Sequence, residues 1–160
     1  MIEPDDRKFI AIDRDAFRVT VYRLEPELPD GVSPDWEDRH GLWVREKFYD
    51  VAIGAIGYAT PKGVHYISSR ALDPTWRMPD SEWVPVKLRG KEIPGGSPDN
   101  PLVAAFIALG GHREDGVGFH GTRDRLSIGS RASHGCIRML EEDVLDLYHR
   151  VPDGTLVFIY

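Results

Sequence analysis

The chain has 160 residues, enough for one domain whose core needs no disulfide or metal to fold. Hydrophobic residues make up 41% and charged residues 29%, which argues against disorder, and a net charge of −6 gives no basic footprint for nucleic acid. No apolar run approaches the roughly 20 residues that span a bilayer. We therefore expect a single domain over residues 1–160, a monomer with neither nucleic acid nor a membrane as partner.

The first ten residues, MIEPDDRKFI, carry acids where a secretory signal peptide has a basic segment followed by an apolar one. The sequence thus shows no export signal. We expect either a protein that stays inside the cell or a chain trimmed of that signal.

Strand patterns dominate the first half of the chain. Residues 9–24 alternate between apolar and polar on both sides of a polar break, which predicts a β-hairpin. Residues 25–41 are rich in proline, glycine and acids and predict a loop. Residues 42–57 return to strand character, and residues 60–72 predict a turn followed by a strand.

The second half begins with a segment that is rich in proline and glycine. Residues 73–101 predict a long excursion over the surface. Residues 101–111 suit a short helix or a buried strand, and we predict a strand. Residues 115–122 predict a short strand that ends in a turn.

Residues 140–151 give the one convincing helix. Val144, Leu147, Tyr148 and Val151 form one apolar face at helical spacing. Acids fill the first turn and basic residues the last, the order that the helix dipole favours. Residues 155–160 predict a buried final strand. The predicted fold class is mainly β, a mixed sandwich or partly closed barrel, with one prominent helix after the cysteine.

The stretch SHGCIRM holds the only cysteine, Cys136. A lone cysteine is either a small buried hydrophobe or a reactive group. A thiol becomes a nucleophile when a nearby imidazole takes its proton and a third group orients that imidazole. His120, in GFHGT, is the candidate base, and the Gly121 carbonyl could orient its ring.

Two further features of this segment fit nucleophilic catalysis. A helix that starts near Ile137–Leu140 would bring its positive end close to the sulfur and lower the thiol pKa. The backbone amides of Gly135 and Cys136 could point at a developing oxyanion.

A basic patch would attract a substrate with carboxylates. It consists of Arg123, Arg125, Arg131 and Arg138, against the single acid Asp124.

Several simpler interpretations stay open. Cys136 could be a buried structural thiol, His134 a structural histidine, and the arginines a solvated face. Zinc bound by His120, His134 and Cys136 is a further alternative. The sequence lacks CxxC and HExxH spacings, so we predict no metal and no cofactor.

GVGFHGT followed by SIGSRASHGCIRM resembles the L,D-transpeptidase (YkuD-type) catalytic domain, whose pattern is an HG histidine, a short spacer and an [S/T]HGC block. Other segments are also similar to the family: FIAIDRDAFRVTVYR, VAIGAIGYATPKGVHYI, NPLVAAFIAL and LEEDVLDLYHRVPDGTLVFIY. The resemblance covers roughly residues 8–160. It implies the family's mixed β-sandwich.

The resemblance also implies a role for each matched residue. Cys136 would be the acyl-accepting nucleophile, His120 its base, and Gly121 the source of the carbonyl that holds the ring. The oxyanion pocket would be shaped by His134, Gly135 and Cys136, with Ser133 bracing the loop and Arg138 supporting the site or meeting a substrate carboxylate.

By the same resemblance, the substrate is a peptidoglycan stem tetrapeptide, and the product a 3→3 cross-link formed with release of D-alanine. The alternatives are an L,D-carboxypeptidase and a non-catalytic wall-binding module. The location would be the cell wall, periplasm or cell exterior. The chain departs from the family in its short spacer between His120 and Ser133, and in enlarged segments at 25–41 and 73–101, which could form a lid or a groove wall.

Overall fold

The computed structural model describes residues 7–111 and 116–160. Within them the fold is mainly β with one α-helix, α1 (Glu141–Arg150), as predicted. Two small sheets pair β5 (Ile53–Gly54) with β11 (Arg131–Ser133) and β7 (Trp76–Arg77) with β8 (Glu92–Ile93). The other strands, all in one sheet, are β1 (Lys8–Asp13), β2 (Arg18–Glu25), β3 (Trp36–Asp38), β4 (Gly41–Asp50), β6 (Gly63–Leu72), β9 (Val103–Gly110), β10 (Gly118–Thr122), β12 (Ile137–Leu140) and β13 (Leu156–Ile159).

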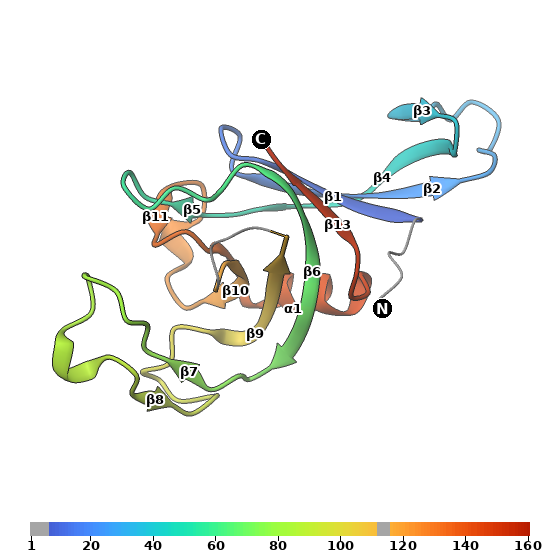
Figure 1. The fold of residues 1–160 in the computed structure, drawn as a ribbon. Coiled ribbons are helices and arrows are strands. Elements are labelled where there is room, and N and C mark those ends of the chain that lie inside the picture. The colour runs from blue at the N-terminus through green and yellow to red at the C-terminus, as the bar shows by residue number, and fades with distance from the viewer. Residues whose placement is uncertain (1–6, 112–115) are drawn as a thin grey trace.

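The large sheet is mixed and strongly bent. Its strand order is β12-β10-β9-β6-β13-β1-β2-β4-β3, with β1 parallel to β13, β10 parallel to β12, and the other pairs antiparallel. The long strand β6 curves from the half that contains β1, β2 and β4 to the half that contains β9 and β10 (Figure 1). The two ends of the sheet, β12 and β3, do not pair with each other, so the sheet curls without closing into a barrel.

Period-2 alternation builds the core as the sequence predicts. Ile10 and Ile12 on β1 and Val19 and Val21 on β2 are fully buried, and the residues between them face outward. Residues from both halves of the bent sheet and from α1 complete one cluster, among them Tyr49, Ile67, Ile107, Phe119, Ile137, Met139 and Leu147.

The predicted helix is confirmed, but it begins later than the site hypothesis required. Val144, Leu147 and Val151 are buried on its inner face. Residues Ile137–Leu140 form strand β12 instead of a helical turn. Their side chains alternate between buried and half-buried, and their backbone pairs with β10 on one side and Ala52 on the other, so extended backbone satisfies more hydrogen bonds there.

Most other predicted elements are confirmed, with additions. The hairpin over residues 9–24 is β1–β2, and residues 101–111 contain strand β9. The predicted loop at 25–41 also contains the short strand β3. The excursion at 73–101 contains the β7–β8 pair and a 3-10 turn at Val86–Leu88. The predicted strand at 115–122 is β10, although its first predicted residue, Asp115, lies outside the described residues.

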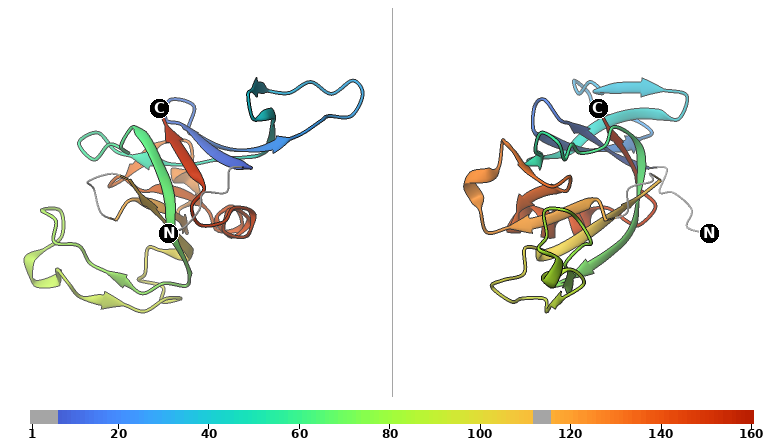
Figure 2. Two further views of the ribbon diagram at one scale, coloured as in Figure 1. Left: turned by 45° about the vertical axis from the view of Figure 1, so that its right-hand side comes forward. Right: turned by 60° about the vertical axis from the view of Figure 1, so that its left-hand side comes forward.

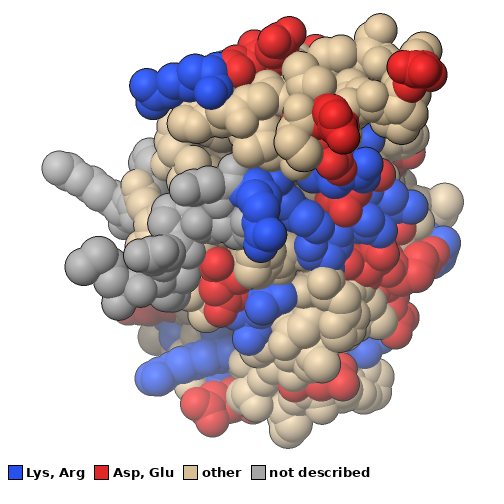
Figure 3. Space-filling model, turned by 90° about the vertical axis from the view of Figure 1, so that its right-hand side faces the viewer, with Lys and Arg blue, Asp and Glu red and all other residues tan. Residues whose placement is uncertain are grey.

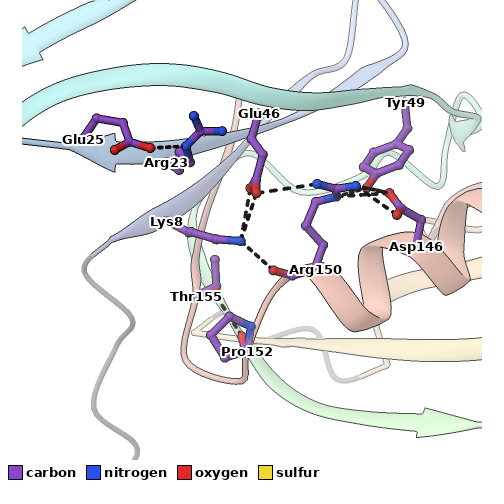
Figure 4. Close-up of polar contacts among 9 residues, drawn as sticks. All are labelled: Lys8, Arg23, Glu25, Glu46, Tyr49, Asp146, Arg150, Pro152 and Thr155. Atoms are coloured by element: carbon purple, nitrogen blue, oxygen red, sulfur yellow. Dashed lines mark hydrogen bonds and ion pairs between the residues drawn. The ribbon is translucent and has the colours of Figure 1, made fainter. Parts of the chain in front are cut away.

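A group of polar side chains joins α1 to the sheet (Figure 4). Arg150 pairs with Asp146 at 2.9 Å and with Glu46 on β4 at 3.5 Å. Lys8 on β1 pairs with the same glutamate at 3.2 Å and donates to the Arg150 carbonyl at 2.9 Å. The Tyr49 hydroxyl donates to Asp146 at 2.5 Å. Three elements far apart in sequence are therefore linked beside the helix.

The described part of the chain contains no helix that is both long and apolar enough to cross a bilayer.

Candidate active site

His120 lies on β10, and its side chain is only 6% exposed. Its Nδ1 is 2.8 Å from the carbonyl oxygen of Gly121. A carbonyl only accepts hydrogen bonds, so Nδ1 carries the proton, and in the neutral ring Nε2 keeps its lone pair. The fold therefore presents a ring nitrogen that can accept a proton, as the resemblance implied for His120 and Gly121.

A β-bulge gives the Gly121 carbonyl this position. The β9–β10 register shifts between His120 and Gly121, opposite Val103. Ala104, beside the bulge, has a φ of 65°, a left-handed conformation that alanine rarely adopts. A Cβ on Gly121 would lie 2.4 Å from the Val103 carbonyl, so no larger residue fits there. This site thus uses a backbone oxygen where other triads use a carboxylate.

The pairing of β10 with β12 places Cys136 on the same face of the sheet as the histidine. His120 is the register partner of Arg138 in this parallel pair. Alternate residues of a strand face the same side, so Cys136, directly before β12, shares the face of Arg138 and His120. Residues 120 and 136 thus lie on one face of two neighbouring strands.

The Cys136 thiol is half-buried, and its Sγ donates to the Gly116 carbonyl at 3.4 Å. Burial raises the pKa of this thiol above its ordinary value, while a backbone hydrogen bond from Gly118 and the positive charge of Arg138 act in the opposite direction. The expectation that a helix end lowers this pKa is wrong. Strand β12 separates residue 136 from Glu141 by roughly 16 Å at about 3.3 Å per residue, and the dipole acts only near the first turn.

The turn that carries the thiol is fixed by short hydrogen bonds. Ser133 Oγ donates to the Cys136 carbonyl at 2.5 Å and accepts from the Gly135 amide at 3.2 Å. Thr60 Oγ1 donates to the Gly135 carbonyl at 2.8 Å. Gly135 has a φ of 122°, which requires glycine. Ser133 thus links both ends of the turn, and the Gly135 amide is directed at Ser133 rather than at a substrate.

A pocket of about 320 Å³ opens beside His120. Within the two described ranges, the Arg138 guanidinium at this pocket makes no hydrogen bond or ion pair. The other three arginines of the basic patch are engaged: Arg125 with Glu142, Arg131 with Asp15, and Arg123 with two backbone carbonyls. Besides His120 and Arg138, the lining residues are Pro98, Asp99, Asn100, Pro101, Val103, Thr122, Arg123 and Asp124.

Electrostatics keep the imidazoles of the site neutral. Burial lowers the pKa of His120 to about 4, and Arg138 adds to this effect, while hydrogen bonds with the backbone of Gly121 and Pro101 oppose it. Burial and Arg138 also lower the pKa of His134. Since burial raises the thiol pKa, the resting pair is a neutral thiol and a neutral imidazole.

The sequence did not predict two aromatic residues that contact His134. The His134 ring stacks on Trp83 with centroids 4.0 Å apart, and Tyr58 meets it edge-on at 4.8 Å. Trp83 belongs to the 73–101 excursion, which the sequence marked only by its proline and glycine and its length. Tyr58 and Thr60 lie in the quoted segment GYATPKG, whose resemblance to the family signalled its position but not its role.

The zinc alternative finds no support in the geometry. Among residues 7–111 and 116–160, no three His, Cys, Asp or Glu side chains form a group that could hold a metal ion. His120, His134 and Cys136 all lie in these ranges, so they do not make the site that zinc would need.

Comparisons with known proteins identify the family. The family model described as the L,D-transpeptidase catalytic domain matches residues 34–159. The putative L,D-transpeptidase YqjB of Bacillus subtilis is 38% identical over 116 residues, 71% of this chain and 59% of that protein. The probable L,D-transpeptidase YcfS of Escherichia coli is 35% identical over 117 residues, 69% of this chain and 36% of that protein. The chain thus spans between about a third and three fifths of these relatives.

Solved structures share the fold. The NMR structure of the catalytic domain from the Enterococcus faecium L,D-transpeptidase matches with a TM-score of 0.60 and 20% identity, covering 96% of both chains. An L,D-transpeptidase from Mycobacterium smegmatis matches with a TM-score of 0.66 and 17% identity over 96% of this chain and 58% of that one. At such identities the likeness concerns the fold, whereas the family model matches most of the sequence, including the HG and SHGC motifs. This chain belongs to the L,D-transpeptidase catalytic domain family.

Proposed function

We propose that this chain is the catalytic domain of a peptidoglycan L,D-transpeptidase in which Cys136 is the nucleophile and His120 its base. Its substrate is a stem tetrapeptide that ends in D-alanine. The observation that carries the proposal is the β10–β12 register, which puts both residues on one face while the Gly121 carbonyl holds Nδ1 of the histidine. Family membership and the names of the relatives support the substrate class.

The first half-reaction makes a thioester. The Cys136 sulfur attacks the carbonyl carbon that joins the third stem residue to D-alanine, and its proton passes to Nε2 of His120. The C–N bond then breaks, and the same proton goes to the leaving amine of D-alanine. Both groups rest in their neutral forms, so the reaction includes the transfer of the thiol proton to the imidazole.

The second half-reaction releases the acyl group. A side-chain amine of a neighbouring stem attacks the thioester, gives a proton to His120, and displaces the Cys136 sulfur, which is reprotonated. The product is a 3→3 cross-link. Water in place of the amine would make the chain an L,D-carboxypeptidase, which shares the first half-reaction.

Arg138 fits the role of a substrate carboxylate partner. Its guanidinium lies at the pocket beside His120 and has no hydrogen-bonding partner among the described residues. Carboxylates bind well to arginine because two parallel hydrogen bonds can form. Since peptidoglycan lies outside the cytoplasmic membrane, we place the domain's activity in the cell wall, periplasm or exterior.

The test is incubation with a disaccharide-tetrapeptide, with D-alanine release measured for wild type, Cys136→Ala and His120→Ala. We expect no release above background from Cys136→Ala and a loss of about 10²–10⁴-fold from His120→Ala. Circular dichroism and urea unfolding check that both variants fold. Release by folded Cys136→Ala at the wild-type rate would disprove the assignment.

Product masses separate the remaining alternatives. With an acceptor stem present, a transpeptidase gives a cross-linked dimer, whereas a carboxypeptidase gives the tripeptide under all conditions. A wall-binding module without catalysis releases no D-alanine at all.

A further inference from the structure

Residues 73–101, called the arm from here on, leave the sheet between β6 and β9 and project from the body of the molecule (Figures 1 and 2). The base of the arm is well anchored. The Asn100 side chain donates to the carbonyls of Pro74, Ile93 and Pro94 at 2.9–3.2 Å. Arg123 donates to the Asn100 carbonyl at 2.8 Å.

The outer part of the arm touches the active site through one aromatic contact. The Trp83 and His134 rings are 4.0 Å apart and 9° from parallel. Tyr58, from the turn after β5, meets His134 at 76°. The imidazole is thus held by rings from two segments that are distant in sequence. Trp76, on β7 of the same arm, makes no ring contact with His134 among the described residues.

The held ring belongs to the turn that presents the thiol. His134 is followed directly by Gly135 and Cys136. Hydrogen bonds from Ser133 and Thr60 fix the backbone of this turn, but among the residues that the structure describes none donates to or accepts from the His134 side chain. The aromatic contacts are therefore what restrain it. When a reacting atom is misplaced by about 1 Å, the rate can fall about a hundredfold.

We propose that Trp83 is a positioning residue: by stacking on His134 it fixes the Ser133–Cys136 turn, so that the thiol stays on the face that it shares with His120. The proposal rests on the proposed function. It makes the arm part of the apparatus for the first half-reaction, in addition to any part it plays as a wall of the substrate groove.

The kinetic test compares Trp83→Leu and Trp83→Phe with Trp76→Leu as the matched control. We expect Trp83→Leu to lower kcat for D-alanine release about tenfold with little change in KM. A more mobile turn misplaces the thiol and slows the chemical step more than it weakens substrate binding. Trp83→Phe should keep most of the rate, because its ring can still stack, and Trp76→Leu should match wild type. Unchanged D-alanine release in Trp83→Leu, or a change confined to the KM for the acceptor, would overturn the proposal.

A second measurement does not depend on the reaction. The Gly135 amide, which donates to Ser133, should exchange its proton about tenfold faster in Trp83→Leu than in wild type or Trp76→Leu, as seen by NMR. Equal exchange in all three proteins would refute the positioning role even if the enzyme is active. If wild type releases no D-alanine, the proposed function fails, and the exchange rates still decide whether Trp83 orders the turn.

Discussion

His120 is a titratable side chain that the fold keeps neutral. Its neighbours explain both its tautomer and its low pKa: Gly121 binds the Nδ1 proton, while burial and Arg138 disfavour a second proton. The same arginine lies close enough to lower the pKa of His134 and to oppose the rise in the thiol pKa. One cation thus affects three groups of the site, and it does so because β12 follows the thiol as a strand.

The low pKa of His120 predicts how stability depends on pH. The folded pKa, about 4, lies below the unfolded value of about 6.5, so the unfolded state binds the proton first. Stability is therefore complete above pH 6.5 and falls as pH drops towards 4, by on the order of 3 kcal/mol for this group. Urea unfolding between pH 7 and pH 4 should show this extra loss in wild type but not in His120→Gln. Parallel curves for the two proteins would contradict it.

Among the elements, the arm is anchored at its base by a buried amide side chain. Asn100 is 1% exposed. Its Nδ2 donates hydrogen bonds to three backbone carbonyls, and its Oδ1 accepts one from the Leu102 amide at 2.8 Å. The NPL segment suggested by the sequence is therefore a structural joint between the arm and β9. Its position beside His120 means that the base of the arm also forms one side of the pocket.

Replacing Asn100 by Ala should destabilise the protein by about 2–3 kcal/mol, because buried backbone groups lose their partners. Ser97→Ala is the matched control on the same arm, since its hydroxyl makes only an exposed hydrogen bond with Asp99. We expect that variant to stay within about 0.5 kcal/mol of wild type. Chemical denaturation measures both, and equal stabilities would show that Asn100 does not anchor the arm.

At the scale of the whole molecule, charge pairing joins the helix to the sheet. One face shows basic side chains near its centre with acidic ones beside them (Figure 3). In the group formed by Lys8, Glu46, Arg150, Asp146 and Tyr49, burial alone would raise the pKa of Asp146, but hydrogen bonds from Tyr49 and Arg150 outweigh it and lower this pKa. Asp146 is thus stabilised in its charged form by the folded structure.

Asp146→Asn should reduce the free energy of unfolding by about 1–2 kcal/mol at pH 7, through weaker charged hydrogen bonds. Because the folded pKa of Asp146 lies below its ordinary value, the contribution is complete above the unfolded pKa, about 3.9, and disappears as pH falls through the folded one. The difference from wild type should therefore shrink in acid. Asp50→Asn, which removes a pair with Arg18 that is mostly exposed, is the control and should cost well under 1 kcal/mol. Equal losses in the two variants would contradict the prediction.

The sequence by itself determined most of the long strands, the helix and the two residues that we propose to react. Period-2 alternation in strands and 3.6-residue spacing in helices show which face of an element is buried. Ile10, Val21 and Leu147 could therefore be assigned to the core from the residues next to them in sequence. The lone Cys136 and the histidine in GFHGT were visible because glycines and motif spacing mark the turns that carry them. These features depend on residues that are close together in the chain.

The tertiary structure alone decided how the site is organised. The start of α1 depended on whether Ile137–Leu140 found pairing partners on both sides, which came from β10 and Ala52. The low pKa of His120 depended on burial, and the contact of Trp83 with His134 on the path of the arm. Pairing, burial and stacking join segments that are far apart in the chain, and local sequence pattern does not encode distances between such segments.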